Sequence, residues 1–384
     1  MVLSPTMVTE AEVSMQYRLR VSKEPAVVHQ IDVASSTILH EVRVADSVST
    51  EFTRFDSVSS YSENVQEAIT GTSKSKYLPS IRSGSYSDIG SRMSMEDEHI
   101  RIDDLSSHPV SLNFCTPGAF YAVFDGHGGP EAATYVKRNA MRLFFEDTLL
   151  PDALEFDNLF QKRLEDSHRE AFLQADHALA NEPTVSSSCG TTALTALILG
   201  RHLLVANAGD CRAVLCRRGT AIEMSQDHRP SYAPEQKRVL ESGGFVLDGY
   251  LNGCLSITRA LGDWDMKLPL GSCSPLIAEP DFRWATLCEE DEFLIIACDG
   301  LWDVMSSQYA VSLVRQGLRR HNDPQQCARE LVMDALRLKT SDNVTVLVVC
   351  LSTPEPYPPL RRRLRCFNIS EEARNRLRNF LGGN

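Results

Sequence analysis

The 384-residue chain lacks several features that would place it in a class of protein at once. No apolar run approaches the ~18 residues that cross a bilayer, so we predict no membrane span. The first residues show neither the apolar core nor the cleavage site of a secretory leader, and Val2 does not fit the N-myristoylation pattern. A formal net charge of −12 offers no basic footprint, so we expect no nucleic-acid partner.

Cysteines are present, but none of them shows paired spacing. The eleven cysteines include no C-x-x-C pair, which argues against a zinc site. Their odd number and the missing leader predict reduced thiols, so we expect the cytoplasm, the nucleus or both. The basic cluster Arg361–Arg365 could serve as a nuclear signal or an anion patch, although a solvated tail is the favoured interpretation.

Composition divides the chain into three parts. Residues 1–83 are rich in Ser, Thr, Val and Glu without a lasting period, which predicts a disordered N-terminal extension. Residues 84–352 alternate apolar runs with helical patterns, which predicts the catalytic domain. Residues 353–384 begin with a Pro-rich linker and continue as a basic C-terminal tail, with a weak helix from about Ser370.

The central part is expected to be an α+β fold. Its short runs rich in Val, Leu, Ile and Phe predict strands at Ala119–Phe124, Thr191–Leu199, His202–Ala208, Arg212–Arg217, Glu292–Ala297 and Val344–Leu351. Gly200-Arg201 reads as a hairpin turn between two of these strands. Helical patterns, three of them opening with a proline, predict helices at Pro130–Leu149, Leu159–Ala180, Pro234–Ser242, Ser306–Arg319 and Pro324–Arg337. Hairpins beside long helices indicate antiparallel sheets covered by helices.

Three of the apolar strands each meet an aspartate at one end. Asp125 follows one strand, Asp299 follows another, and Asp342 precedes a third. A carboxylate at the rim of a buried sheet is costly to desolvate unless it is paired or bound to a metal. If the strands are neighbours, their rims converge on one acidic cleft, where divalent cations would relieve the repulsion.

Other groups fit the same chemistry. Further carboxylates that could join the cleft are Glu96, Asp97, Asp210 and Asp303. Oxygen donors without thiolates suit Mg²⁺ or Mn²⁺, and two such ions roughly 3.5–4 Å apart can share a hydroxide aimed at phosphorus. Arg92 is the natural candidate to hold phosphoryl oxygens in a bidentate fork. His127, inside the Asp-Gly-His-Gly-Gly turn, is placed to protonate a leaving alkoxide, and the Gly126 carbonyl could itself bind a metal.

At this point an ordered set of motifs resembles a known family. Phe124-Asp-Gly-His-Gly-Gly129 looks like the signature of the protein phosphatase 2C family, and Ser91–Asp97 resembles its Arg-x-x-Met-Glu-Asp segment. Further matching segments, in family order, are Cys189–Ala193, Asn207–Arg212, Asp227–Pro230, Leu255–Asp263, Ala297–Val304 and Ser341–Thr345. Arg229 stands where lysine is commoner, and the flap-like segment Leu251–Lys267 looks most like plant members.

The resemblance implies a four-layer α/β/β/α sandwich of two antiparallel sheets flanked by helices. It implies a metal-dependent phosphatase that hydrolyses phosphoserine and phosphothreonine in proteins with a hydroxide bridging two Mg²⁺ or Mn²⁺ ions. Arg92 would hold the phosphate, and His127 would act as the general acid. The two core ions would be bound by Asp125, Gly126, Asp299 and Asp342, with help from Glu96 and Asp97.

The resemblance also implies a weaker third ion, at Asp210 with Asp299 and Asp303. Because every ligand of the family motif is present, we expect an active enzyme that works as a monomer on phosphorylated proteins, with kinases as one candidate class. One plant branch acts as abscisic-acid co-receptors through a tryptophan in the flap. The segment Gly244–Cys254 has no tryptophan, so we expect this chain to lie outside that branch.

Three alternatives stay open at this point. A non-catalytic scaffold of the same fold could bind phosphoproteins, but it would be expected to have lost a metal ligand. A different dinuclear hydrolase could act on small phosphate esters. Finally, Cys211 to Arg217 fits the C-x₅-R spacing of cysteine-dependent phosphatases, but the segment alternates like a strand and has no glycine to cradle phosphate.

Overall fold

The computed structural model describes residues 77–107, 117–146, 157–267, 273–352 and 371–372. The predictions for most of the N-terminal extension, for the Pro-rich linker and for nearly all of the basic tail fall outside these residues. The same holds for the last part of the helix predicted over Pro130–Leu149. Among the described helices, none has the length and apolar character to cross a membrane.

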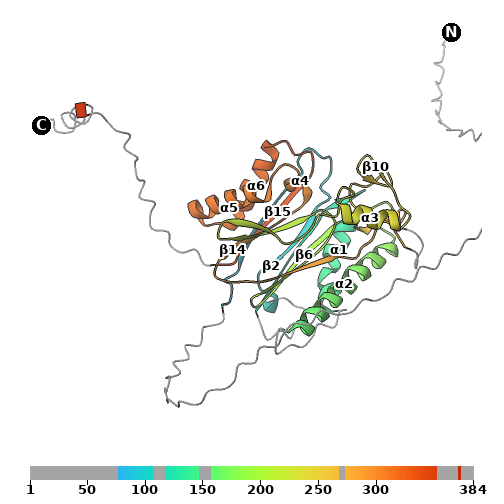
Figure 1. Cartoon of the computed structure of the whole chain (residues 1–384), viewed down its shortest axis with the longest axis horizontal. Helices are drawn as coiled ribbons and strands as arrows, with labels where there is room; N and C mark the ends of the chain where they lie inside the picture. The colour runs from blue at the N-terminus through green and yellow to red at the C-terminus, as the bar shows by residue number, and fades with distance from the viewer. Residues whose placement is uncertain (1–76, 108–116, 147–156, 268–272, 353–370, 373–384) are drawn as a thin grey trace, which may run out of the picture. The chain divides into compact units, whose positions relative to one another are not determined.

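Two five-stranded antiparallel sheets form the middle of the molecule (Figure 1). The first sheet has the strand order β1 (Arg82–Asp88), β15 (Val344–Cys350), β14 (Asp291–Ala297), β8 (Arg212–Arg217) and β9 (Thr220–Glu223). The second sheet has the order β13 (Asp281–Thr286), β7 (His202–Ala208), β6 (Ala193–Leu199), β3 (Gly118–Phe124) and β2 (Glu98–Ile102).

Helices cover the outer face of each sheet (Figure 1). The first sheet is covered by α4 (Asp299–Trp302), α5 (Ser307–His321) and α6 (Pro324–Arg337). The second is covered by α1 (Glu131–Met141), its π-helical continuation η2 (Arg142–Glu146) and α2 (Asn158–Ala180). These layers confirm the prediction of an α/β/β/α sandwich. A short 3-10 turn, η1 (Leu105–Ser107), follows β2.

The remaining elements lie at one end of the sheets. A three-stranded sheet consists of β12 (Leu261–Gly262), β5 (Gly190–Thr191) and β4 (Gly126–His127). A separate hairpin, β10 (Val246–Leu247) and β11 (Tyr250–Leu251), stands beside helix α3 (Ala233–Glu241). We call residues 244–259 the flap. It packs on α3 through a small core that includes Val239, Leu251 and Ile257.

The central strands are apolar along their whole length because both of their faces are buried. In β3, Phe120, Ala122 and Phe124 face helices α1 and α2, whereas the alternate residues Tyr121 and Val123 face the other sheet. The strands β14 and β15 alternate in the same way between the inter-sheet core and helices α4 to α6. Successive side chains of a strand point to opposite faces of the sheet, and here both faces are covered. Apolar residues therefore follow one another without a break in these strands instead of alternating with polar ones.

The helices begin where the sequence provides caps. Asp323 caps α6 by accepting a hydrogen bond from the Gln325 amide, and Pro324 occupies the first helical position. Pro234 lies in the first turn of α3, while Pro130 is the residue before α1 rather than its first. The three predicted helix starts are therefore correct to within one residue.

One predicted strand, Thr191–Leu199, is divided in the structure. It breaks at Thr192, which separates β5 from β6. The Thr192 amide donates to the Asp125 carbonyl at 2.9 Å, and its hydroxyl accepts from the Asp125 amide at 3.1 Å. The chain leaves the large sheet here because Thr192 forms these two hydrogen bonds with Asp125 instead of pairing with a neighbouring strand.

The strands that the sequence did not predict, apart from the two-residue ones, lie at or beside sheet edges: β1, β2, β9 and β13. Strand β1 reads Arg-Ser-Gly-Ser-Tyr-Ser-Asp and lacks an apolar run. Its register is nevertheless fixed by seven antiparallel pairs with β15. A Cβ on Gly84 would lie 2.2 Å from the Gln325 amide nitrogen, so glycine is what lets α6 pack directly on this strand.

Candidate active site

A cavity of about 420 Å³ opens at the end of the sandwich next to the flap. Eight of the ten residues predicted for the site line it: Arg92, Glu96, Asp125, Gly126, His127, Asp210, Asp299 and Asp342. Tyr250, Cys254 and Leu255 of the flap form another part of its wall. The two remaining predictions lie close by, with Asp97 buried beside Asp125 and Asp303 next to Asp299.

The aspartates reach this cavity from both sheets. Asp125 follows β3 of the second sheet, whereas Asp299 follows β14 and Asp342 precedes β15 in the first. The expectation that the three strands are neighbours is correct for β14 and β15 and wrong for β3. Their ends still converge, because the two sheets are stacked and the acidic ends meet across the interface between them.

Asp125 lies at the centre of the acidic groups. Its carboxylate is within 4.8 Å of ligand atoms of Asp210 and Asp299, and also within 4.8 Å of a carboxylate oxygen of Asp97. Desolvation raises the pKa of Asp125 well above its usual value, and the charges of Asp97 and Asp299 raise it further. The pKa of Asp299 is raised in the same way, first by desolvation and then by Asp210 and Asp303.

Asp97 and Asp210 are the most deeply buried members of the group. Burial raises the pKa of each to about 6, although Arg229 acts in the opposite direction on Asp210. The Asp97 Oδ2 atom is buried without a hydrogen-bond partner. An unpartnered carboxylate oxygen beside other carboxylates is a site that a cation would stabilise, and a set of oxygen donors suits Mg²⁺ or Mn²⁺.

Cys298 lies next to this group, with its Sγ within 4.8 Å of the Asp97 and Asp125 carboxylates. Its pKa is raised well above the usual value, chiefly by burial and then by the charges of Asp97 and Asp125. Its Sγ accepts a hydrogen bond from the Thr345 amide at 3.1 Å.

The Gly126–Gly129 turn brings backbone atoms to the cavity wall. A Cβ on Gly126 would lie 2.4 Å from the Glu96 carbonyl oxygen, so only glycine permits this approach. The Glu96 carboxylate accepts from the Gly129 amide at 3.2 Å, and the Glu96 amide donates to the Asn343 side chain at 2.8 Å. Glu96 is thereby held between the strand ends that carry Asp125 and Asp342.

Arg92 stands at the mouth of the cavity. Its Nη2 atom lies 2.6 Å from the Asp342 Oδ2 atom, and its Nε donates to the Ser341 carbonyl at 3.2 Å. The side chain is 57% exposed, so it is accessible to a ligand entering from solvent. Asp342 therefore orients a guanidinium that still has unused N–H groups.

His127 is held by a buried carboxylate, Asp263, that the sequence did not single out. The His127 Nε2 atom lies 2.8 Å from Asp263 Oδ2, and only 3% of the Asp263 side chain is exposed. The three-stranded sheet sets this pair, because β5 pairs Gly190 with His127 on one side and with Gly262 on the other. A Cβ on Gly190 would meet the Asp263 carboxylate at 2.1 Å, so this glycine makes the contact possible.

Arg229 is the second residue that sequence reasoning missed. Its guanidinium lies 3.0 Å from Asp210, 3.1 Å from Asp299 and 2.8 Å from Asp303. These are the three carboxylates that the family resemblance assigned to a weaker third ion. The helical turn α4 brings Asp299 and Asp303 to the same side, as their spacing predicted.

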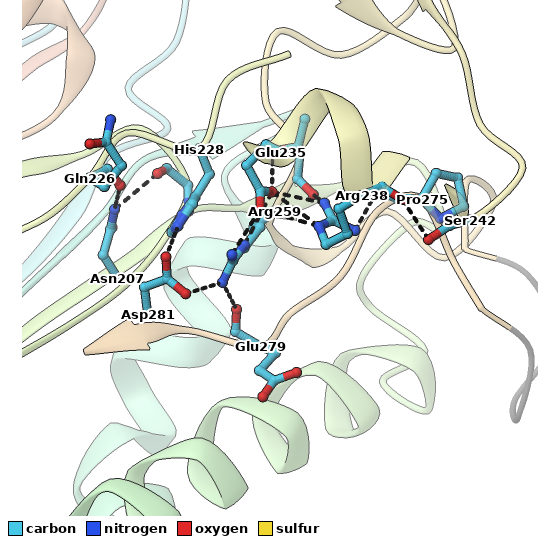
Figure 2. Close-up of polar contacts among 12 residues, drawn as sticks. Asn207, Gln226, His228, Glu235, Arg238, Ser242, Arg259, Pro275, Glu279 and Asp281 are labelled. Carbon is cyan, nitrogen blue, oxygen red and sulfur yellow. Dashed lines mark hydrogen bonds and ion pairs between the residues drawn. The ribbon is translucent and has the colours of Figure 1, made fainter. Parts of the chain in front are cut away.

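A polar network beside the cavity, in which His228, Glu235 and Arg259 are buried, fixes the loop before Arg229 (Figure 2). His228 is fully buried; its Nδ1 accepts from the Gly209 amide at 3.1 Å, and its Nε2 lies 3.1 Å from Asp281 Oδ2. Arg259 continues the network from Asp281 to Glu235, and Arg238 also binds Glu235 (Figure 2).

The charges in this network are balanced internally. Burial alone would raise the pKa of Glu235, but hydrogen bonds from Arg259 and Arg238 outweigh it and lower the pKa to about 2. A hydrogen bond from His228 and the charge of Arg259 likewise lower the pKa of Asp281. Glu235 and Asp281 are therefore not candidates for metal ligands.

The cysteine-dependent alternative does not fit the structure. Residues Arg212–Arg217 form strand β8 rather than a phosphate-binding loop. Cys211 is fully buried, and burial raises the pKa of its thiol well above the usual value. A buried, protonated thiol at the start of a strand cannot serve as the nucleophile.

The residues that were missed carried weak signals. Asp263 ends the Leu255–Asp263 motif, and Arg229 lies in the Asp227–Pro230 motif, so both were inside recognised segments. Their roles depend on partners that are 136 residues away for Asp263 and 70 for the Asp299 contact of Arg229. Sequence spacing does not reveal such contacts.

Comparisons with known proteins agree with this geometry. The family model described as protein phosphatase 2C matches residues 82–344. The chain is 54% identical over 389 residues to "Probable protein phosphatase 2C 13" of Arabidopsis thaliana, with 100% of both chains covered. It is 61% identical over 317 residues to "Probable protein phosphatase 2C 2" of Oryza sativa subsp. japonica, covering 80% of this chain and 83% of that protein.

Two solved structures share the fold. One is a sex determining protein of C. elegans, with a TM-score of 0.60 and 24% identity over 71% of this chain and 65% of that chain. The other is a phosphatase of Toxoplasma gondii, with a TM-score of 0.58 and 22% identity over 73% of this chain and 96% of that chain.

Proposed function

The chain is a plant-type member of the protein phosphatase 2C family and a protein serine/threonine phosphatase, and from this premise we propose how its acidic cavity hydrolyses phosphoserine and phosphothreonine. One observation carries the proposal: carboxylates from both sheets meet around Asp125 with raised pKa values and too few internal cations. Such a group is stable in its charged form only when external cations bind to it.

Two divalent ions, Mg²⁺ or Mn²⁺, would be held by Asp125, Asp299, Asp342 and the Gly126 carbonyl, with Glu96 and Asp97 in support. The unpartnered Asp97 Oδ2 atom and the predominance of carboxylate oxygens around it favour this assignment. When bound, the ions supply positive charge to the phosphoryl oxygens and make the attacking water more acidic.

Arg92 holds the phosphoryl group in this proposal. Its exposed guanidinium, oriented by Asp342, offers planar N–H groups to phosphoryl oxygens. The substrate phosphate would then lie between Arg92 and the acidic floor. Fixing the phosphorus there converts a collision with water into a reaction between held groups.

His127 protonates the leaving seryl or threonyl oxygen as its bond to phosphorus breaks. Asp263 holds the Nε2 side of the ring, which leaves Nδ1 to donate the proton. We propose that water attacks phosphorus directly, with no phosphoenzyme. An acid-quenched turnover that trapped a covalent phosphoprotein would contradict this step.

The substrates we propose are phosphoserine- and phosphothreonine-containing proteins, kinases among the candidates. We propose a monomer as the active unit. We expect the protein in the cytoplasm, the nucleus or both.

The decisive test uses the purified full chain, a phosphothreonine peptide and a panel of small phosphate esters. We expect peptide hydrolysis with Mg²⁺ or Mn²⁺, loss of activity in EDTA and recovery when the ion is restored. Binding of the peptide without hydrolysis would favour a phosphoprotein-binding scaffold. Hydrolysis confined to the small esters would favour a metabolite phosphatase.

A further inference from the structure

The acidic groups of the cavity divide into an inner and an outer set. The inner set surrounds Asp125, and among the residues that the structure describes no Lys or Arg is paired with Asp125 or Asp97. The outer set consists of Asp210, Asp299 and Asp303, which share one guanidinium at 3.0, 3.1 and 2.8 Å. Asp210 and Asp299 belong to both sets, because the carboxylate of each also lies within 4.8 Å of Asp125.

The position of Arg229 is fixed by the residues on either side of it. Asp227, two residues earlier, receives two hydrogen bonds from Arg212, at 3.0 and 2.6 Å. His228 is held to Gly209 by hydrogen bonds of its backbone amide and of its ring, and Gly209 directly precedes Asp210. The amide of Thr258, which lies in the flap, also donates a hydrogen bond to the His228 carbonyl at 2.9 Å. The arginine and the Asp210 turn are therefore parts of one rigid connection.

A guanidinium suits this position better than an ammonium. Its five N–H groups lie in one plane and can serve several carboxylates at once, whereas a lysine offers a compact point charge on a flexible stem. A divalent ion among the same three carboxylates would lie within a few ångströms of this positive charge. Repulsion at that range, with little water between, opposes its binding.

We propose that Arg229 is the built-in counter-cation of the outer set, so that the native protein binds two divalent ions and a third enters only when this guanidinium is removed. By neutralising Asp210 and Asp303, Arg229 also positions the Asp299 carboxylate toward the inner set. This inference rests on the proposed metal-dependent function and goes beyond it by assigning a side chain to the outer site.

The test counts the Mn²⁺ ions bound by the full chain. The number is measured by isothermal titration calorimetry and by the electron paramagnetic resonance signal of the Mn²⁺ that stays unbound. We expect two ions on the wild type and three on Arg229→Gln. The double variant Arg229→Gln with Asp303→Asn should return to two, because the extra site loses a ligand. As a control, Arg320→Gln removes the same charge from an exposed pair between Arg320 of α5 and Glu330 of α6, and this variant should still bind two ions.

Thermal unfolding gives a readout that does not depend on turnover. In EDTA, Arg229→Gln should melt at a lower temperature than the wild type, because Asp210 and Asp299 lose their counter-charge. Added Mn²⁺ should raise the melting temperature of this variant more than that of the wild type. If the Arg229→Gln variant does not fold, Arg229→Met answers the same question, since it also removes the charge and keeps an unbranched side chain.

Three ions on the wild type would overturn the proposal, as would two ions on both Arg229 variants. A third ion that persists in the double variant would also overturn it, since that ion would lie elsewhere. These results are distinct from failure of the proposed function. A wild type that binds no Mn²⁺ and shows no metal-dependent activity contradicts the function, whereas an active two-ion enzyme with unchanged Arg229 variants contradicts only this inference.

Discussion

Two groups of carboxylates lie near each other in this protein, and their buried members behave in opposite ways. Around Asp125, burial and mutual repulsion raise the pKa values of the aspartates. In the network of Figure 2, Glu235 is also buried, yet its pKa falls to about 2. The two groups differ in their partners, because Arg259 and Arg238 both bind Glu235 while Asp125 is surrounded by other acids.

The difference separates a structural role for buried acid from a binding role. A buried carboxylate with its own arginines is already satisfied and fixes the backbone around it. A buried cluster without enough arginines is incomplete until cations arrive, and it is therefore poised to bind them. Arg229 lies at the boundary, since it joins the loop held by the Figure 2 network to the outer acids of the cavity.

The largest expected effect comes from removing a charge at the centre of the incomplete group. Asp125→Asn should lower turnover of a phosphothreonine peptide by more than about 100-fold, which exceeds the cost of losing a supporting partner of a metal ligand. It should not lower the melting temperature of the metal-free protein, because one of several mutually repelling charges is gone.

The measurement pairs steady-state kinetics with thermal unfolding in EDTA. Asp166→Asn, which removes an equal charge from an exposed pair with Arg169, serves as the matched control and should change neither property appreciably. Full activity in the Asp125→Asn variant would mean that the acidic cavity is not the reaction centre.

A smaller effect is expected for Asp263, a buried carboxylate whose partner is a histidine ring. Asp263→Asn should slow hydrolysis of a phosphothreonine peptide by about 10- to 100-fold. This loss does not exceed the contribution of a general acid, which is about 10²–10⁴-fold, because the variant keeps the His127 ring and loses only its partner. Hydrolysis of p-nitrophenyl phosphate should fall much less, because nitrophenolate leaves without a proton.

The ratio of the two activities is the diagnostic quantity for Asp263. His127→Gln should show the same selective loss, since it removes the proton donor whereas Asp263→Asn removes the charge that holds this donor. An equal loss on both substrates would indicate that Asp263 only supports the fold of the three-stranded sheet.

The sequence predicted the interior of the fold better than its edges. Strands β3, β14 and β15 are buried on both faces, so their apolar runs were visible in the sequence. Strand β1 is held by backbone pairing with β15 and by the close approach of α6 at Gly84, and neither leaves an apolar pattern. Edge strands of this kind become apparent only when their neighbours are known.

The site was predicted to a similar extent. Asp125, Asp299 and Asp342 stood out because each adjoins an apolar strand, and the structure brings all three to one cavity. That Asp125 approaches from the other sheet could not be predicted, because stacking of the sheets depends on packing over the whole chain. The partners Asp263 and Arg229 were hidden for the same reason.

The smallest expected effect tests the satisfied group. Glu235→Gln should lower the free energy of unfolding at pH 7 by about 1–3 kcal/mol, because Arg259 and Arg238 keep a neutral acceptor but lose its charge. Because the folded pKa of Glu235 is depressed from 4.5 to about 2, its contribution is complete above pH 4.5 and is lost as the pH falls through 2. Urea unfolding of the wild type and of Glu235→Gln at pH 7, 4 and 3 should therefore show a difference in the free energy of unfolding that becomes smaller as the pH falls.

Glu330→Gln serves as the control, because Glu330 belongs to an exposed pair, and it should lower the free energy of unfolding by less than about 1 kcal/mol. If the difference in the free energy of unfolding between the wild type and Glu235→Gln stayed constant from pH 7 to pH 3, Glu235 would act through packing rather than charge. The contrast between the two acidic groups would then fail.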